Sequence, residues 1–68
     1  MNVSIRYPGD RFEHKRWGNN RRLPVVGDTW LIQDGGSNDG DLLVVKHVTW
    51  HDKDETISDV TIFLEREP

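Results

Sequence analysis

The stretch from Asp41 to Trp50 constrains the fold most, because it is the longest apolar and β-branched run in the chain. A helix over these residues would place Leu42, Val45, Val48 and Thr49 on one face. However, the valines and the threonine are β-branched and lose side-chain freedom in a helix. We therefore predict a strand, and its apolar character predicts that it lies in the middle of a sheet.

Alternate side chains of a strand share a face. One face of the predicted strand would carry Leu42, Val44, Val48 and Trp50, with Lys46 as an interruption, and the other would carry Leu43, Val45, His47 and Thr49. Both faces are apolar over residues 42–45, so we expect this half to be covered on both sides. The half after Lys46 should run out towards a surface, with His47 and Trp50 on opposite faces.

Turn signals and alternation place further strands on either side. Residues 34–40 contain three glycines and read as the tip of a hairpin that follows a strand over 29–33. The segment over residues 57–65 alternates from Asp59 onward and directs Val60, Ile62 and Leu64 inward. Together with residues 41–50 they predict a three-stranded meander.

The N-terminal part is less regular. Val3, Ile5 and Tyr7 alternate with polar residues and predict a short strand, which a turn of type II at Pro8-Gly9 would end. Residues 11–22 follow neither a helical nor a strand period, and a breaker at 18–20 interrupts them. We expect an irregular arm there and see no convincing helix anywhere.

The amount of apolar sequence limits the size of the core. The chain has 68 residues, of which 34% are hydrophobic and 31% charged, and it has no cysteine. It should form a single domain (1–68, with an arm over 1–22 and a meander core over 23–66) whose stability is marginal without disulfides, so a partner or a second copy is expected. No apolar run approaches the roughly 20 residues of a membrane span, and no signal peptide is evident. We expect a soluble cytoplasmic protein.

Charge is distributed unevenly along the sequence. Residues 1–24 carry six basic and two acidic side chains, whereas residues 25–68 carry three basic and ten acidic ones. Either the basic arm folds against the acidic body, or it contacts an anionic partner.

The sequence offers little chemistry of the kind that enzymes use. Serines 4, 37 and 58 are distant in sequence from the histidines, and no nucleophile elbow, phosphate-binding loop or carboxylate pair is present. His47 and His51 would lie roughly 13 Å apart on an extended strand, too far to share a metal. The acidic residues of 34–41 do not fit a calcium-loop pattern. We therefore predict no enzyme, no cofactor, no metal and no small-molecule substrate.

The order of these elements resembles a known kind of fold. A Val26-Gly27-Asp28 turn feeds a strand and a hairpin, then residues 43–50, a short loop and residues 60–65. Over residues 23–66 this order resembles small SH3-like or KOW-like barrels. In its general sequence character the chain resembles short uncharacterised phage or prophage proteins. The resemblance implies an all-β fold: a small SH3-like barrel or strongly bent antiparallel sheet of about five short strands. It also implies binding of proteins, peptides or nucleic acids, although we identify no SH3-type aromatic peptide groove.

The candidate partner-binding residues are the basic and aromatic residues of the arm and the outer half of the central strand. They are Arg11, Lys15, Arg16, Trp17, Arg21, Arg22, His47 and Trp50. The leading hypothesis is a non-enzymatic protein-binding module, such as a phage-encoded accessory protein or an inhibitor of a host protein. One alternative is a nucleic-acid binder that uses the cations and aromatic planes of the arm. Another is a structural virion component.

Overall fold

The computed structural model describes residues 1–18, 20–33, 35–37, 39–52 and 58–67. They form five strands: β1 (Asn2–Arg6), β2 (Phe12–Arg16), β3 (Thr29–Leu31), β4 (Leu42–Trp50) and β5 (Val60–Arg66). These residues include no helix, and hence none that could cross a membrane. The prediction of an all-β fold with about five short strands is confirmed.

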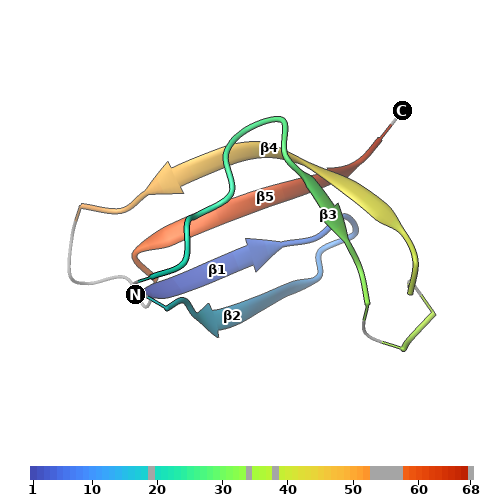
Figure 1. The fold of residues 1–68 in the computed structure, drawn as a ribbon, viewed down its shortest axis with the longest axis horizontal. Coiled ribbons are helices and arrows are strands. Elements are labelled where there is room, and N and C mark those ends of the chain that lie inside the picture. Colours follow the sequence, from blue (N-terminus) through green and yellow to red (C-terminus); the bar gives the residue numbers. More distant parts are fainter. Residues whose placement is uncertain (19, 34, 38, 53–57, 68) are drawn as a thin grey trace.

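All five strands belong to one sheet, in the order β2-β1-β5-β4-β3 (Figure 1). The sheet curls into a half-barrel, and β2 and β3 are its two edges. The meander β3-β4-β5 is antiparallel as predicted, whereas β1 pairs with β5 in parallel, a pairing that the sequence did not predict. The cause is the connection over residues 17–28, which carries the chain from one edge of the sheet to the other and lets β5 return beside β1.

The core lies on the concave face of the curled sheet. Its buried hydrophobic residues are Val3, Ile5, Trp17, Ile32, Leu43, Val45, Val60, Ile62 and Leu64. Tyr7 packs against this cluster at the end of β1. The predicted inward directions of the alternating residues in β1 and β5 are therefore confirmed.

A β-bulge in β4 changes which of its residues face the core. Val45 lies opposite Leu64 and His47 lies opposite Phe63, so Lys46 is an extra residue without a partner in β5. The extra residue shifts the alternation by one position. As a result Val48 follows Val45 onto the core side, and the prediction that it shares a face with Leu42 and Val44 is wrong.

The ends of β4 also differ in part from expectation. Leu42 was expected to be covered, yet 46% of its surface is exposed, because β3 is short and the described residues form no second layer over the outer face. Beyond the bulge most residues are exposed, as predicted. His47 and Trp50 pair with Phe63 and Val60, which point to opposite faces of β5, so their predicted separation is correct.

Strand β2 was not predicted and corrects the expectation of an irregular arm over 11–22. It pairs residue for residue with β1, from Arg6 opposite Phe12 to Asn2 opposite Arg16. Both of its faces are polar or exposed, because β2 is an edge strand and its inward side chains, Glu13 and Lys15, lie away from the core. Because neither face of β2 covers the core, its sequence does not need alternating apolar residues.

Gly27 forms the turn that leads into β3, with a φ of 98° and an N–H that donates to the carbonyl oxygen of Val45 at 2.9 Å. A Cβ here would meet no atom within 4 Å, so a side chain would cost only backbone strain. We expect Gly27→Ala to lower the free energy of unfolding by about 1–2 kcal/mol in urea denaturation. Gly18→Ala is the control, since that site is equally open and has no positive φ. Equal losses in both variants would contradict the strain argument.

Candidate functional site

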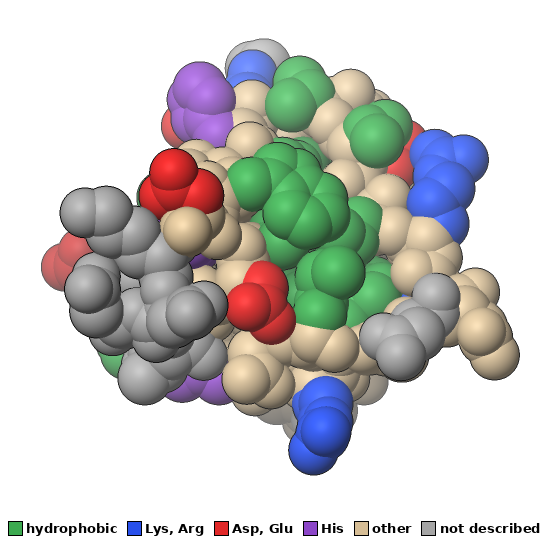
Figure 2. All heavy atoms as spheres, turned by 90° about the vertical axis from the view of Figure 1, so that its left-hand side faces the viewer, with side chains coloured by type: hydrophobic (Ala, Val, Ile, Leu, Met, Phe, Trp, Pro, Cys, Tyr) green, Lys and Arg blue, Asp and Glu red, His purple; other side chains and the backbone are tan. Residues whose placement is uncertain are grey.

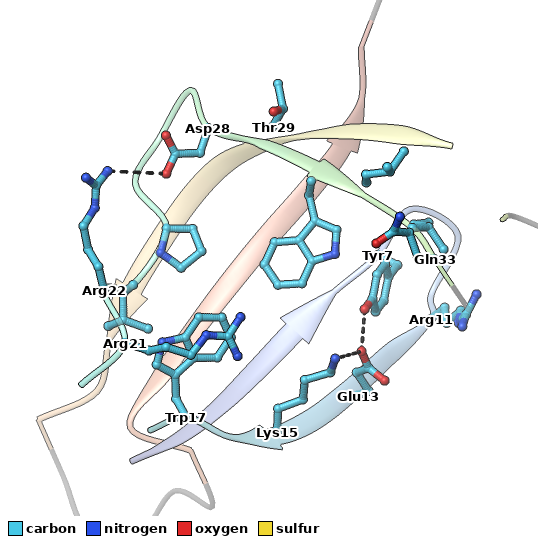
Figure 3. A pocket seen from close by; sticks show the side chains of 15 residues that line it. Tyr7, Arg11, Glu13, Lys15, Trp17, Arg21, Arg22, Asp28, Thr29 and Gln33 are labelled. Atoms are coloured by element: carbon cyan, nitrogen blue, oxygen red, sulfur yellow. Dashed lines mark hydrogen bonds and ion pairs between the residues drawn. The ribbon is translucent and has the colours of Figure 1, made fainter. Parts of the chain in front are cut away.

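A cleft of about 630 Å³ opens between the two edges of the half-barrel (Figure 3). One side is formed by side chains of β2, of its flanking residues and of Tyr7, and the other by residues 29–33 on and after β3. The connection that crosses from one edge to the other closes one end with Arg21, Arg22 and Leu23. The cleft therefore lies where a closed barrel would join β2 to β3.

The strand period explains which residues of the N-terminal segment line the cleft. Arg11, Glu13, Lys15 and Trp17 are spaced by two, and alternate residues of a strand project to the same side. Trp17 continues the pairing just beyond β2, because its N–H donates to the carbonyl oxygen of Met1 at 2.7 Å. Pairing with β1 thus places alternate residues of this segment along one side of the cleft, although the segment has no apolar pattern.

Aromatic rings lie at the centre of this cleft. Trp17 and Trp30 have ring centroids 6.4 Å apart, and Trp17 is only 5% exposed. The guanidinium carbon of Arg21 lies 4.3 Å from the ring centroid of Trp17, and that of Arg11 lies 5.2 Å from the ring of Tyr7. No local pattern predicted an aromatic groove, because these rings come from three separate segments.

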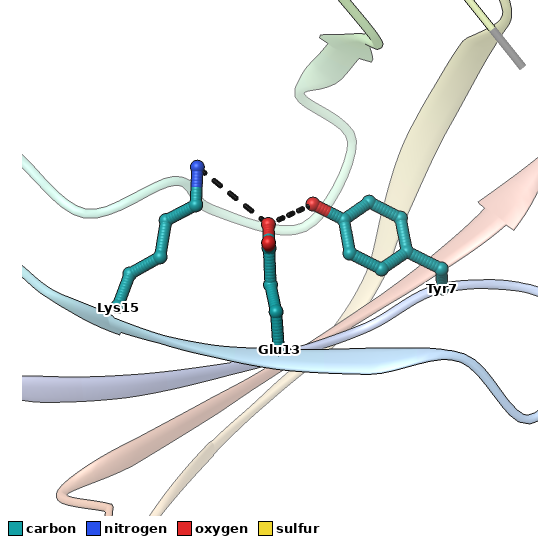
Figure 4. A network of polar contacts seen from close by, with 3 residues as sticks. All are labelled: Tyr7, Glu13 and Lys15. Atoms are coloured by element: carbon teal, nitrogen blue, oxygen red, sulfur yellow. Dashed lines mark hydrogen bonds and ion pairs between the residues drawn. The ribbon is translucent and has the colours of Figure 1, made fainter. Parts of the chain in front are cut away.

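The carboxylates of the cleft are held by neighbouring side chains. The Tyr7 hydroxyl donates a hydrogen bond to Oε1 of Glu13, and Nζ of Lys15 lies 3.5 Å from the same oxygen (Figure 4). Asp28 is paired with Arg22 at 3.8 Å. The lining as a whole contains four basic and two acidic residues, so it carries an excess of positive charge.

The backbone of β3 contributes a second recognition element. The carbonyl oxygen of Asp28 accepts from Val45, the N–H of Ile32 donates to Asp41, and Trp30 lies opposite Leu43, so these alternate positions are directed to β4. In an antiparallel ladder the intervening residues direct their N–H and C=O groups to the other side. The backbone groups of Thr29 and Leu31 therefore point away from β4, on the side of the cleft.

The structure divides the predicted partner-binding residues into two groups. Five of them line the cleft together: Arg11, Lys15, Trp17, Arg21 and Arg22. Arg16 lies on the outer face of β2, while His47 packs edge-on against Phe63 with ring centroids 6.1 Å apart. β1 and β5 separate β2 from β4 in the sheet, so Arg16 and His47 do not lie on neighbouring strands.

Trp50 lies apart from the cleft, at the end of β4, and is 62% exposed. The end of the molecule towards which β4 runs is the left-hand side of Figure 1. Seen from that side, Figure 2 shows apolar side chains gathered in the middle, with acidic side chains beside them and basic ones near the rim.

Serine and histidine side chains meet on the outer face of the sheet, which the sequence did not predict. Ser4 Oγ lies 2.9 Å from Nδ1 of His14, and Ser58 Oγ lies 3.3 Å from the same nitrogen. Sequence separation concealed this proximity, because β1 pairs with both β2 and β5 and brings the three residues together.

Comparisons with protein-family models, with curated proteins and with solved structures find no significant match to this chain.

Proposed function

We propose that the protein is a non-enzymatic binding module whose cleft takes an extended, acidic segment of a partner protein. The observation that carries this proposal is the juxtaposition of a strand edge at Thr29 and Leu31, to which no other described strand pairs, with an aromatic, positively charged wall. Strand addition to a free edge is a recurring mode of peptide recognition, in which main-chain hydrogen bonds supply affinity and neighbouring side-chain pockets supply specificity.

The extended form of the ligand follows from the edge of β3. Its free N–H and C=O groups recur at every second residue, a spacing of roughly 6.6–6.8 Å, which only an extended chain can match. A ligand strand would also shield the edge of β3, which otherwise presents unpaired backbone groups to solvent.

The acidic character of the ligand follows from the charges of the cleft. Glu13 and Asp28 already have cationic neighbours, and the lining retains more basic than acidic residues. Arg21 lies over the ring of Trp17, so less side-chain freedom is lost when a carboxylate binds it. Arginine and tryptophan are also the residue types that most often dominate protein interfaces.

Nucleic-acid binding remains the alternative, and the geometry of the rings supports it less. Bases stack on open aromatic faces, whereas Tyr7 and Trp17 each have a face covered by an arginine. By resemblance to small phage proteins, we favour a cytoplasmic accessory protein or host-protein inhibitor. A structural virion component would instead form large assemblies of itself, which light scattering detects.

A selection of random displayed peptides against the purified protein tests the proposal. We expect enriched peptides in which acidic and apolar residues alternate, and we expect their binding to perturb the backbone amide signals of Thr29 and Leu31. Trp30→Ala should weaken the selected peptides by about 30-fold, the effect of removing an interface hot spot. Arg21→Gln, which leaves the core unchanged, should weaken them about 10-fold and reduce the salt dependence.

Trp50→Ala is the matched control, because it removes the same side chain at an exposed position outside the cleft. It should change the dissociation constant by less than about two-fold. The proposal fails if no peptide is enriched, or if Trp50→Ala weakens binding as much as Trp30→Ala does.

A further inference from the structure

The outer face of the half-barrel carries a second pocket, of about 340 Å³, on the side of the sheet opposite the core. It lies over β1, β2 and β5 and shares no lining residue with the cleft. Outer faces of small sheets are usually solvated, yet Ser4, Ser58 and Thr61 at this pocket are only 7%, 5% and 8% exposed. These buried polar side chains indicate a built site rather than an ordinary surface.

Strand register explains how the polar side chains come together. His14 of β2 lies opposite Ser4 of β1, and Ser4 lies opposite Thr61 of β5, so a polar row crosses three adjacent strands. In the neighbouring row, Arg6 of β1 lies opposite Phe12 of β2. Directly paired residues of neighbouring strands share a face, which places all five side chains on the outer side.

Hydrogen bonds fix the buried hydroxyl groups of this row. Ser4 Oγ bonds both Nδ1 of His14 and Oγ of Ser58, and Nε2 of His51 lies 2.8 Å from Oγ1 of Thr61. One nitrogen of each imidazole is thereby engaged, which restrains the orientation of the ring. The hydroxyl groups and both imidazoles are held in place before any ligand arrives.

The described residues at the pocket carry basic and hydroxyl groups. Among them the lining contains Arg6, two histidines and three hydroxyl residues, and no aspartate or glutamate. The guanidinium carbon of Arg6 lies 5.2 Å from the ring centroid of Phe12, which holds the cation at the rim. The nearby carboxylate of Asp59 accepts a hydrogen bond from the N–H of Asn2 at 2.9 Å. Donors and cations without a carboxylate suit an anion.

Two other chemistries fit the pocket less well. Ser4 and His14 resemble the first two members of a catalytic triad, but in a triad a carboxylate orients the imidazole through Nδ1. Here Nδ1 of His14 faces the serines instead, and the edge of the ring meets Phe12, with centroids 5.4 Å apart. Within the described residues no three histidine, aspartate or glutamate side chains are grouped as a metal site requires.

We propose that this outer pocket binds a phosphate-type oxyanion, either free or as the terminal group of a phosphate monoester. Arg6 supplies a charged donor, and the imidazole of His14 and hydroxyl groups of the buried row supply further hydrogen-bonding groups. Donors that come from three strands suit a tetrahedral anion better than a planar carboxylate. The exposed ring of Phe12 lies where the organic part of a monoester would rest.

Titrations with inorganic phosphate and with phenyl phosphate, followed by NMR of the imidazole and backbone signals, test this proposal. We expect saturable chemical-shift changes at His14, His51 and Arg6. A titration with sodium chloride of equal ionic strength in place of the phosphate should not produce them. Arg6→Gln should weaken binding by at least about 10-fold, since a charged donor is lost. Tighter binding of phenyl phosphate would assign the site to monoesters, and equal binding would assign it to the free anion.

His47→Ala is the matched control, because His47 lies on the same outer face but outside the pocket. It should leave the phosphate affinity unchanged. Trp30→Ala should also leave it unchanged, because Trp30 lines the cleft and not the outer pocket. Shifts that do not saturate, or an equal loss of affinity in His47→Ala and Arg6→Gln, would overturn the proposal without bearing on the cleft.

Discussion

Replacing Ile62 with alanine should lower the free energy of unfolding by about 2–5 kcal/mol, the usual cost of truncating a buried isoleucine. Ile62 has no exposed surface and lies in β5, which pairs on both sides. Its neighbours across the strands are Ile5 of β1 and Val48 of β4, so truncation leaves a cavity bounded by both. Urea denaturation followed by far-UV circular dichroism measures the change.

The expected loss is large relative to the whole stability of so small a domain. A chain of this length should have a free energy of unfolding of about 3–10 kcal/mol, so Ile62→Ala should be partly unfolded at room temperature if the true value lies near the lower limit. Leu42→Ala is the control, because it also removes a branched aliphatic side chain from a strand but one that is 46% exposed. Losses of equal size in the two variants would place the core elsewhere.

The strands that sequence reasoning predicted are those in which local pattern and burial agree. Residues 60–64 alternate because one face of β5 covers the core, and the glycines at 35 and 40, both at positive φ, terminate the strands around the hairpin. Strand β2 has neither signal, since its inward residues reach the cleft rather than the core. An edge strand of this kind is defined by its partner, which a local pattern cannot identify.

The β-bulge at Lys46 shows a second limit. A lysine inside an apolar strand signals an irregularity, and the sequence does mark it, but strict alternation assigns every later residue to the wrong set of neighbours. Only the pairing with the opposite strand determines whether the lysine has a partner in a regular ladder or is an extra residue in a bulge. The parallel pairing of β1 with β5 depends in the same way on where the connection over 17–28 crosses the sheet.

For the cleft, the sequence predicted residue types better than their arrangement. The concentration of arginine, lysine and tryptophan in the arm was evident, and five of the predicted residues do line one cleft. Tyr7 and Trp30 were missed as members of it, because they reach it from β1 and β3. The polar row of the outer face was missed for the same reason: its residues are adjacent only across strands.

Trp17→Ala should also be strongly destabilising, by about 3–5 kcal/mol. Trp17 is 5% exposed and packs against Trp30, so its ring links the segment after β2 to the opposite edge strand. Its loss should free β3 from this contact and broaden the backbone amide signals of Thr29 and Leu31. Trp50→Ala, at a position 62% exposed, should change the free energy of unfolding by less than about 1 kcal/mol.

Trp17→Phe separates the two physical contributions of this side chain. The indole Nε1 of Trp17 is buried and has no hydrogen-bond partner in the described part of the chain, and an unsatisfied buried donor costs about 1–3 kcal/mol. Phenylalanine removes that cost but buries less apolar area, worth about 1–2 kcal/mol at 25 cal/mol per Å². Because these terms oppose each other, Trp17→Phe should lie within about 1 kcal/mol of the wild type. A loss approaching that of Trp17→Ala would mean that the indole N–H is bonded in solution.

A double-mutant cycle between Trp17 and Trp30 measures the contact across the cleft directly. Aromatic pairs at this separation couple by about 0.5–1.5 kcal/mol beyond the area that they bury. Leucine variants at both positions remove the aromatic contact and leave a smaller cavity than alanine variants, so the coupling should be read from them. A coupling energy near zero would show that the ring contact does not link the two edges of the half-barrel, whereas the expected value means that this contact stabilises their arrangement before a ligand enters.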